Sequence, residues 1–394
     1  MFDRFWGRGN NLQATREATA YLFKNHLYMG LQPTKKWKPL YYIYSAFINI
    51  SVFICLPVSL TLSYCYEFSQ MTTMQFLTSF QMVTNVWGIP VKVLTRMFFI
   101  KHQHQALDIL DTLDARCQRQ DEYKNIRSCA IIGNRLALLF MGFYVLYSTV
   151  TMISSVSMGH PPYTVFMPLM DWRNSTLDFI TQSTIEYIIM NLACLHQAGN
   201  DVYAVIYVYA IRTHMQILVK RVSRLGADRD GSNDKHYEEL VMCIKDHQNL
   251  LSLLEIISPL ISITIFIQFI VTAVILGTTL INILIFADLS AQIASVVYLL
   301  AVLMQTFPCC YYSTCLIDDS EQLSLAIFHC EWFDKDKRFR KMLIFFLMRS
   351  QTPITLTAMK LFPINVSTSV AIGKFSFSLY TLIKQMDFGE NLKN

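Results

Sequence analysis

The chain has 394 residues, of which 53% are hydrophobic and only 15% are charged. Soluble domains carry about 25% charged residues, and disordered or nucleic-acid-binding chains carry long charged blocks. The low charge and the high apolar content therefore exclude a disordered protein, a coiled coil and a nucleic-acid-binding protein. The net charge of +5 is modest, and the mean hydropathy is +0.34. A protein that crosses a membrane several times fits this composition.

The sequence contains no pattern typical of an enzyme, a metal site or a disulfide framework. Its ten cysteines include no pair of CxxC motifs and no Cys/His set at zinc spacing. HExxH, GxSxG, Walker A and GxGxxG motifs are absent. We therefore expect no catalytic residue, no metal and no cofactor. The amino-terminal segment lacks the apolar core of a cleaved signal peptide.

Seven apolar segments are long enough to form membrane-spanning helices, which need about 20 residues each. The apolar stretch 257–317 is too long for one crossing, so its interruption at 287–290 divides it into two spans. We predict an all-α integral membrane protein whose bundle, residues 40–317, holds the first six spans. The predicted spans are 40–62, 76–100, 131–156, 180–211, 257–286, 291–317 and 366–386.

The positions of lysine and arginine indicate which ends of the spans face the cytosol. Most of the 33 basic residues lie in the segment 1–39, in the connections after spans two and four, and in residues 318–365. This distribution predicts a cytosolic N-terminus and an extracellular tail at 387–394, the inverse of G-protein-coupled receptors. The sequon at Asn174 lies in a predicted extracellular loop, where a glycan is expected.

Charged and polar side chains inside the spans require a partner or access to water. Lys92 and Arg96 lie one turn apart near the cytosolic end of span two, so we expect both to extend to the interface. Glu186 is expected to pair within the bundle, with ligand contact as the alternative. The polar residues expected to join helices or to line an inner vestibule are Asn191, Gln197, Asn200, Asp201 and Lys374.

The region after span six holds several short motifs. They are Cys310-Tyr311-Tyr312, Ser320 followed by Trp332, the stretch RSQTP at 349–353, Phe362-Pro363, and FSFS at 375–378 with Gln385-Met386. These motifs resemble the C-terminal region of insect odorant receptors. The loop HPPYTVFMPLMDW at 160–172 and the segment EATAYLF at 17–23 are similar to dipteran members, so the resemblance covers the whole chain.

The resemblance implies a ligand-gated, non-selective cation channel. Subunits of this family form hetero-oligomers, expected to be tetramers, with a shared olfactory co-receptor, and the tuning subunits bind a small volatile odorant. The co-receptor has a much longer connection between spans four and five than residues 212–255, so this chain is similar to a tuning subunit. The implied location is the plasma membrane of olfactory sensory neurons, in contact with the lipid bilayer and permeating cations. The alternatives are a gustatory receptor-type channel and a secondary transporter, although the repeats of a transporter are absent.

The odorant pocket is expected in the outer half of the bundle, between spans two, three, four and six. Apolar and aromatic side chains with a few hydroxyls suit a small volatile molecule, and ordinary helix packing is the alternative. From the direction of each span, the predicted ligand-binding residues are Phe80, Thr84, Tyr144, Tyr147, Ser148, Met152, Ile185, Ile188 and Tyr298.

Span seven is rich in small and hydroxyl residues, which let helices approach closely and let one face tolerate water. The resemblance implies that the end of this helix lines the pore, with lipid-facing packing as the alternative. The predicted pore and gate residues are Ser378, Leu382, Gln385 and Met386.

Residues 318–365 alternate apolar and charged positions at helical spacing, which predicts a cytosolic helical anchor segment. It carries more apolar residues than an isolated surface helix, and such patches mark partner sites. We therefore predict a subunit interface that includes Trp332, Phe345 and Phe346, with burial in the same subunit as the alternative.

Overall fold

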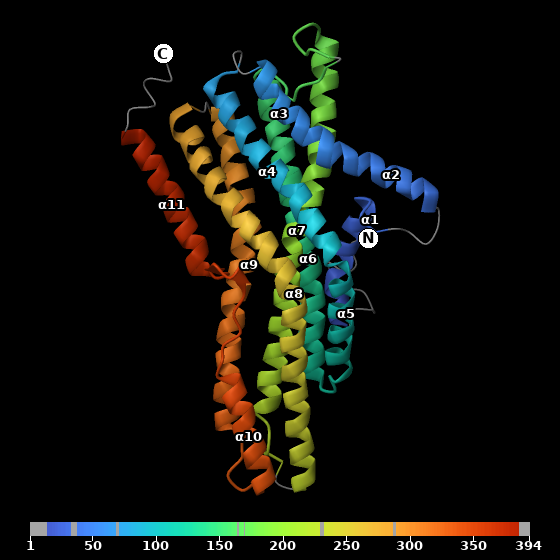
Figure 1. Ribbon diagram of the computed structural model, residues 1–394, viewed down its shortest axis with the longest axis vertical. Coiled ribbons are helices and arrows are strands. Elements are labelled where there is room, and N and C mark those ends of the chain that lie inside the picture. Colours follow the sequence, from blue (N-terminus) through green and yellow to red (C-terminus); the bar gives the residue numbers. More distant parts are fainter. Residues whose placement is uncertain are drawn as a thin grey trace.

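The computed structural model describes residues 14–32, 38–67, 71–163, 165–168, 170–228, 232–286 and 289–385. Apart from one pair of two-residue strands, the regular elements in these ranges are helices, most of which run along one long axis (Figure 1). The helices are η1 (Thr15–Thr19), α1 (Ala20–Tyr28), α2 (Lys38–Ile50), η2 (Ser51–Cys55), α3 (Leu56–Glu67), α4 (Thr73–Phe98), α5 (Ile100–Ala115), α6 (Gln120–Ser157), α7 (Thr176–Val222), α8 (Asn233–Ile281), η4 (Asn282–Phe286), α9 (Leu289–His329), α10 (Lys337–Ser350) and α11 (Val366–Gln385).

The longest helices exceed the thickness of a membrane. α7 has 47 residues and α8 has 49, so each is about 70 Å long at 1.5 Å per residue. The hydrocarbon core of a bilayer is only about 30 Å thick. In Figure 1 the lower parts of α7, α8 and α9 continue together with α10, far below the level of α2, α4 and α11. The long helices therefore build a second helical region beyond the one that a bilayer covers.

Within the described ranges, five helical stretches are long and apolar enough to cross a membrane: Lys38–Tyr64, Gln120–Ser157, Thr176–Val222, Asn233–Ile285 and Gln292–His329. They lie over the first, third, fourth, fifth and sixth predicted spans. α4 and α11 lie over the second and seventh predicted spans, and both are more polar. α4 carries Lys92 and Arg96, and α11 carries Lys374 among several serines.

Side-chain caps fix the starts of several helices. Before α4, the Thr72 hydroxyl accepts from the backbone N–H of Gln75, and the Gln75 side-chain oxygen accepts from the backbone N–H of Thr72. Ser175 starts α7, Ser232 starts α8 and Asp336 starts α10, each by accepting from the N–H three residues on. Each cap satisfies a backbone donor that has no partner within its own helix.

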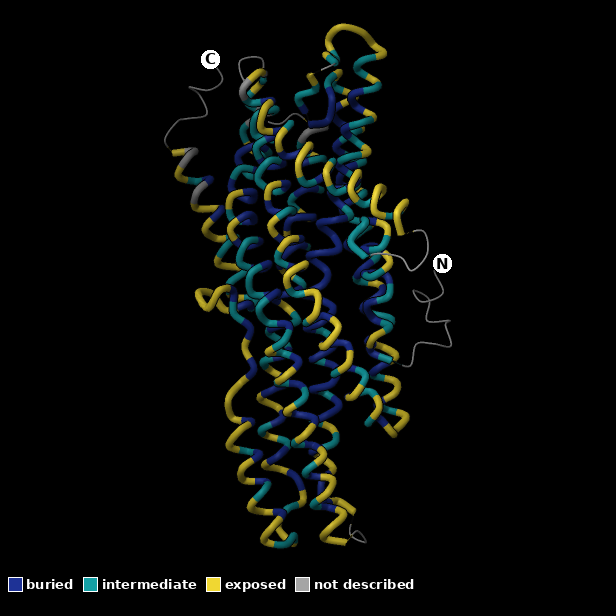
Figure 2. Tube along the Cα trace, turned by 45° about the vertical axis from the view of Figure 1, so that its right-hand side comes forward, coloured by how far each residue is buried: buried dark blue, intermediate teal, exposed yellow. Residues whose placement is uncertain are grey.

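α7 is the central helix of the bundle and packs against α1, α4, α6, α8 and α9. Most of its middle is buried, as the dark blue centre of Figure 2 illustrates. Gly199 lets α1 approach, because a Cβ atom there would lie 2.6 Å from Nδ2 of Asn25. The Asn25 amide donates to the carbonyl of Leu195 at 2.9 Å. Helix α1 thus packs closely against the bundle.

Ion pairs join the lower ends of α5, α6, α7 and α8. Arg221 of α7 donates to Glu122 of α6 at 2.7 Å and to Asp246 of α8 at 2.7 Å, and Arg116 also binds Asp246. Burial alone lowers the pKa of Arg221, but these two carboxylates hold it above its usual value. Ion pairs therefore stabilise the lower region in addition to apolar packing.

The predicted anchor segment 318–365 is helical only in part. After the end of α9 and α10, the chain forms strands β1 (Thr357–Ala358) and β2 (Phe362–Pro363), which pair antiparallel. Met359 and Lys360 in the turn have positive φ. A strand pair with a tight turn therefore stands where a helix was expected, directly before α11.

Two sequence-based expectations require correction. Lys92 and Arg96 do not extend to the interface: their exposed fractions are 1% and 8%, and Lys92 pairs with Asp201 at 2.8 Å. Phe346 is buried, and its ring contacts that of His247 at a centroid distance of 5.6 Å. It packs within its own subunit because α10 folds back onto α8 and α9.

Candidate functional site

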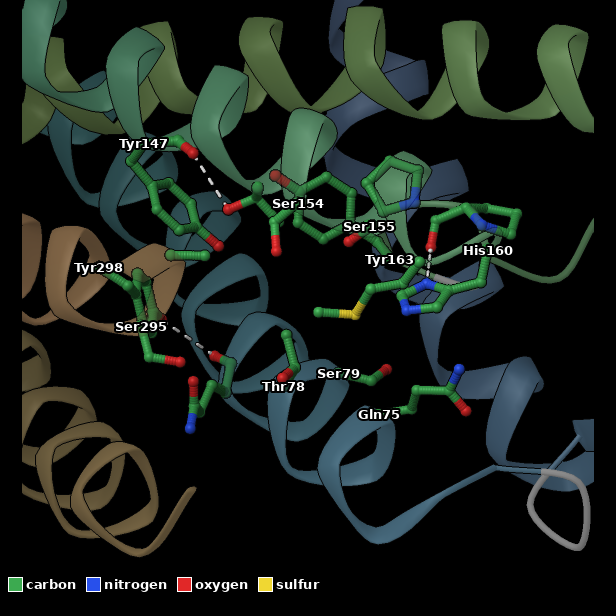
Figure 3. A pocket seen from close by; sticks show the side chains of 16 residues that line it. Gln75, Thr78, Ser79, Tyr147, Ser154, Ser155, His160, Tyr163, Ser295 and Tyr298 are labelled. Atoms are coloured by element: carbon green, nitrogen blue, oxygen red, sulfur yellow. Dashed lines mark hydrogen bonds between the residues drawn. The ribbon is translucent and has the colours of Figure 1, made fainter. Parts of the chain in front are cut away.

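A cavity lies between α4, α6 and α9 at the end of the bundle opposite α10, and we name it the outer cavity. It contains about 600 Å³ of space free of protein atoms, part of which is open to the outside. Figure 3 shows side chains of α4, including Thr78 and Ser79, across from Ser154 and Ser155 of α6. Tyr298 of α9 lies at one side. The lining thus combines aromatic rings with several hydroxyls.

The loop after α6 closes one side of the outer cavity through His160 and Tyr163. Glu186 of α7 holds this loop, because its carboxylate accepts from the backbone N–H groups of Tyr163 at 2.9 Å and Val165 at 3.0 Å. The side chain of Gln182 also donates to Glu186 at 3.0 Å. Glu186 is 1% exposed, so it pairs within the bundle as expected and fixes the loop.

Tyr147 and Tyr298 form the wall between the outer cavity and a deeper one, the inner cavity. Their ring centroids are 4.8 Å apart. The Tyr147 hydroxyl lies 3.1 Å from the Met82 sulfur, and the Tyr298 hydroxyl lies 3.4 Å from the Gln81 carbonyl oxygen. The inner cavity lies between α4, α6, α7 and α9, and it contains about 380 Å³ of space free of protein atoms, part of which is open to its surroundings.

A buried polar network forms one end of the inner cavity. The Asp201 carboxylate of α7 accepts from Lys92 Nζ of α4 at 2.8 Å, from the Tyr144 hydroxyl of α6 at 2.6 Å and from Gln197 Nε2 at 2.9 Å. Lys92 also donates to Gln268 of α8. A buried ion pair offsets its desolvation only when such additional hydrogen bonds are made. The network therefore joins four helices directly beside the cavity.

Comparison with known proteins identifies the family. The sequence matches the family described as "7tm Odorant receptor" over residues 72–377. Odorant receptor 42a of Drosophila melanogaster is 38% identical over 379 residues, which cover 96% of this chain and 93% of that protein. The chain belongs to the insect odorant receptor family. It is therefore a multi-pass membrane receptor and not an enzyme.

Solved structures show the same fold. The insect olfactory receptor OR5 from Machilis hrabei superimposes with a TM-score of 0.75 at 12% identity, over 94% of this chain and 97% of that one. OR5 in complex with eugenol gives a TM-score of 0.72 at 13% identity, with the same coverage. The all-helical membrane architecture predicted from the sequence is thus confirmed.

The structure brings together three of the predicted ligand-binding residues in the receptor. Tyr147 and Tyr298 line both cavities, and Tyr144 lines the inner one. The predicted residues that line neither cavity are Phe80, Thr84, Ser148, Met152, Ile185 and Ile188.

Helical phase explains why one of these predicted residues, Ile188, lines neither cavity. On α7 the inner cavity is lined by Met190, Cys194 and Gln197, whose spacing keeps them on one face. Ile188 lies two residues before Met190, so it turns away, and it is 54% exposed. The sequence predicts how deep a residue lies along its helix, but it does not predict which side of the helix faces the cavity.

Sequence reasoning missed the polar part of the outer cavity. Thr151, Ser154 and Ser155 form a hydroxyl stripe on α6, and the loop residues from His160 to Tyr163 add a rigid Pro-Pro pair. The stripe is visible in the sequence as hydroxyls at helical spacing near the end of an apolar span. The contribution of the loop is not visible in the sequence, because long-range contacts such as those of Glu186 and Gln182 hold the loop beside the cavity.

α11 faces the bundle with only one side. Ile372, Ser376 and Tyr380 face α8 and α9, and the Ser376 hydroxyl lies 3.2 Å from the Ala273 carbonyl oxygen. The predicted pore residues Ser378, Leu382 and Gln385 are exposed, and Met386 lies outside the described residues. The exposed polar residues that share the side opposite the bundle are Ser367, Lys374, Ser378 and Gln385.

The lower region exposes apolar side chains that its own subunit does not cover. Phe345 is 57% exposed, whereas Trp332 is half-buried against the core and donates to the Phe328 carbonyl at 3.2 Å. We call the following set the anchor surface: Leu325, Phe328, Phe333, Ile344, Phe345 and Met348.

Asn174 is exposed in the loop before α7, so its side chain is accessible for glycosylation. Within the described ranges, no group of three or more His, Cys, Asp or Glu side chains is arranged to hold a metal ion.

Proposed function

We propose that this receptor is the odorant-specific subunit of a ligand-gated, non-selective cation channel assembled with an olfactory co-receptor in the plasma membrane of olfactory sensory neurons. The observation that carries the proposal is the pair of cavities inside the bundle, lined by aromatic rings and hydroxyls and partly closed by the loop that Glu186 holds. Such a site suits a small volatile odorant. A receptor of the same fold has been solved with eugenol, which supports a small-molecule ligand here.

We infer seven membrane crossings with the N-terminus in the cytosol. Basic side chains gather in the lower region, for example in the stretch Lys337–Lys341 of α10, and such charge favours the cytosolic side. The cavities then lie in the outer half of the membrane, where odorants arrive. The loop with Asn174 is extracellular in this orientation.

We propose that α11 lines the pore. Lys374 is the ninth of twenty residues in α11, so it lies about 12 Å from the nearer end. It is exposed and shares its side with Ser378 and Gln385. Contact of this side with lipid would be costly, whereas a water-filled pore solvates it. Leu382, beside this stripe, is the candidate for an apolar gate that closes by dewetting.

The anchor surface is the proposed contact with the other subunits of a tetramer. Six large apolar side chains on the end of α9, on α10 and in the connection between them are each more than half exposed. An exposed apolar patch outside the membrane-covered helices marks a partner site. The co-receptor is the partner proposed here.

The proposal is tested by expressing the receptor with an olfactory co-receptor, applying a panel of volatile compounds and recording cation current. In Tyr147→Ala and Tyr298→Ala the half-maximal concentration should rise by roughly tenfold or more, because each variant removes an aromatic wall worth ~1.5–3 kcal/mol of burial. Tyr311→Ala is the matched control, since Tyr311 lies on α9 and lines neither cavity. The proposal fails if no compound evokes current from surface-expressed receptor, or if both cavity variants respond like the control.

A further inference from the structure

The inner cavity has apolar sides and one polar end. Its apolar lining comes from α4, α7 and α9 and includes Met82, Val86 and Met190. Three amide side chains also line it: Asn85 from α4, Gln197 from α7 and Gln305 from α9, whose Oε1 already accepts from Gln268. A molecule that fills this space therefore meets hydrocarbon over most of its surface and amide groups at a few points.

The Asp201 network fixes the orientation of Gln197. An ionised carboxylate only accepts hydrogen bonds, and Gln197 approaches Asp201 at 2.9 Å, so the Gln197 NH₂ group must face it. Lys92 Nζ and the Tyr144 hydroxyl also donate to Asp201, at 2.8 Å and 2.6 Å, so the carboxylate serves as an acceptor for three side chains. The carbonyl oxygen Oε1 of Gln197 must then point elsewhere, and rotating the amide would place two acceptors against each other.

Oε1 of Gln197 has no hydrogen-bond donor among the residues that the structure describes, although the side chain is 2% exposed. Oδ1 of Asn85, across the same cavity, is likewise a buried acceptor without a donor in the described ranges. The hydroxyls of the three tyrosines at this cavity already contact protein acceptors. The cavity thus offers acceptors that need a donor.

We propose that the inner cavity is a subsite for the hydroxyl group of a small alcohol odorant, whose O–H donates to Oε1 of Gln197 or Oδ1 of Asn85. This inference rests on the odorant-binding function proposed above and specifies the chemical class of the ligand. An ester, ketone or ether carries only acceptors and satisfies neither amide oxygen. The aliphatic part of the alcohol contacts the apolar sides of the cavity.

The first test compares two ligands on the unmodified receptor with the co-receptor: a short-chain alcohol and its methyl ether, which has the same carbon skeleton but no donor. The alcohol should activate at a half-maximal concentration at least about tenfold lower, as one hydrogen bond to a buried acceptor implies. Equal potency of the two compounds overturns the inference while leaving the proposed function intact. Absence of any odorant-evoked current refutes the proposed function itself.

Two variants assign the preference to the cavity. Asn85→Leu and Gln197→Met should each reduce the ratio of ether to alcohol half-maximal concentrations towards one. Asn191→Leu is the matched control: Asn191 lies on α7 with its Nδ2 bound to the Tyr187 carbonyl and lines neither cavity. If both cavity variants show the same ratio of ether to alcohol half-maximal concentrations as Asn191→Leu, the alcohol O–H is recognised elsewhere and the inference is wrong. If a variant does not reach the cell surface, the ligand pair on the unmodified receptor decides.

Discussion

Replacing Glu186 by leucine is expected to release the loop that closes the outer cavity. The Glu186 carboxylate accepts from the backbone N–H groups of Tyr163 and Val165, and both bonds are buried. Leucine fills a similar volume but accepts no hydrogen bond. The two backbone donors then remain unsatisfied as long as the loop stays docked, whereas undocking exposes them to water.

The number of bonds sets the size of the effect. A hydrogen bond to a charged group contributes about 1.5–3 kcal/mol, so the loss of two raises the free energy of the docked loop by about 3–6 kcal/mol. Each 1.4 kcal/mol changes the equilibrium between docked and undocked loop tenfold, so the undocked fraction rises by a factor of roughly 10²–10⁴. Glu186→Gln keeps one acceptor oxygen and should produce about half of this free-energy change.

The assay has two readings. Odorant concentration–response curves should show a raised half-maximal concentration, and the current should decay faster after wash-out. Both effects should be largest in Glu186→Leu and smaller in Glu186→Gln, relative to the wild-type receptor. A cysteine introduced as His160→Cys should react faster with an external thiol reagent in the leucine variant. Thr184→Val is the control, since Thr184 lies on the exposed face of α7. Wild-type curves and wild-type cysteine reactivity in surface-expressed Glu186→Leu would refute the reasoning.

Three further predictions concern the pore, the anchor surface and acid stability. Lys374→Glu should increase divalent-cation current through the assembled channel, because a negative charge replaces a positive one along the proposed pore; unchanged reversal potentials in mixed calcium solutions would contradict this. Phe345→Ser should reduce co-purification with the co-receptor by removing exposed apolar surface, whereas Phe346→Ser should lower the thermal stability of the receptor itself; equal effects would contradict the assignment of the two rings. Burial, together with the charge of Arg349, lowers the pKa of His247 to about 4. Because the unfolded histidine titrates near 6.5, the unfolded state binds more protons below that pH, so stability falls between pH 6.5 and 4 by up to about 3 kcal/mol. His247→Phe should reduce this acid sensitivity in thermal unfolding of the detergent-solubilised receptor, and an identical pH dependence would count against it.

The sequence by itself determined the class of protein, the positions of the long helices and the family. These properties depend on local information: the length of the apolar segments, the distribution of basic residues and the C-terminal motifs. The sequence also predicted which α6 side chains lie at the depth of the cavity, since Tyr144 and Tyr147 lie about one turn apart in the outer half of an apolar span. The proposed membrane orientation likewise follows from the distribution of charge.

Tertiary structure alone decided which side of each helix faces a cavity and which charges become paired. Ile188 and Gln197 lie on the same helix, yet one is exposed and the other is buried beside Asp201, because rotation about the helix axis depends on all of its neighbours. Lys92 reaches Asp201 across 109 residues of sequence, and Glu186 reaches backbone donors in a loop about twenty residues away. Such contacts depend on how packed helices are placed in three dimensions, and no pattern within one segment encodes that placement.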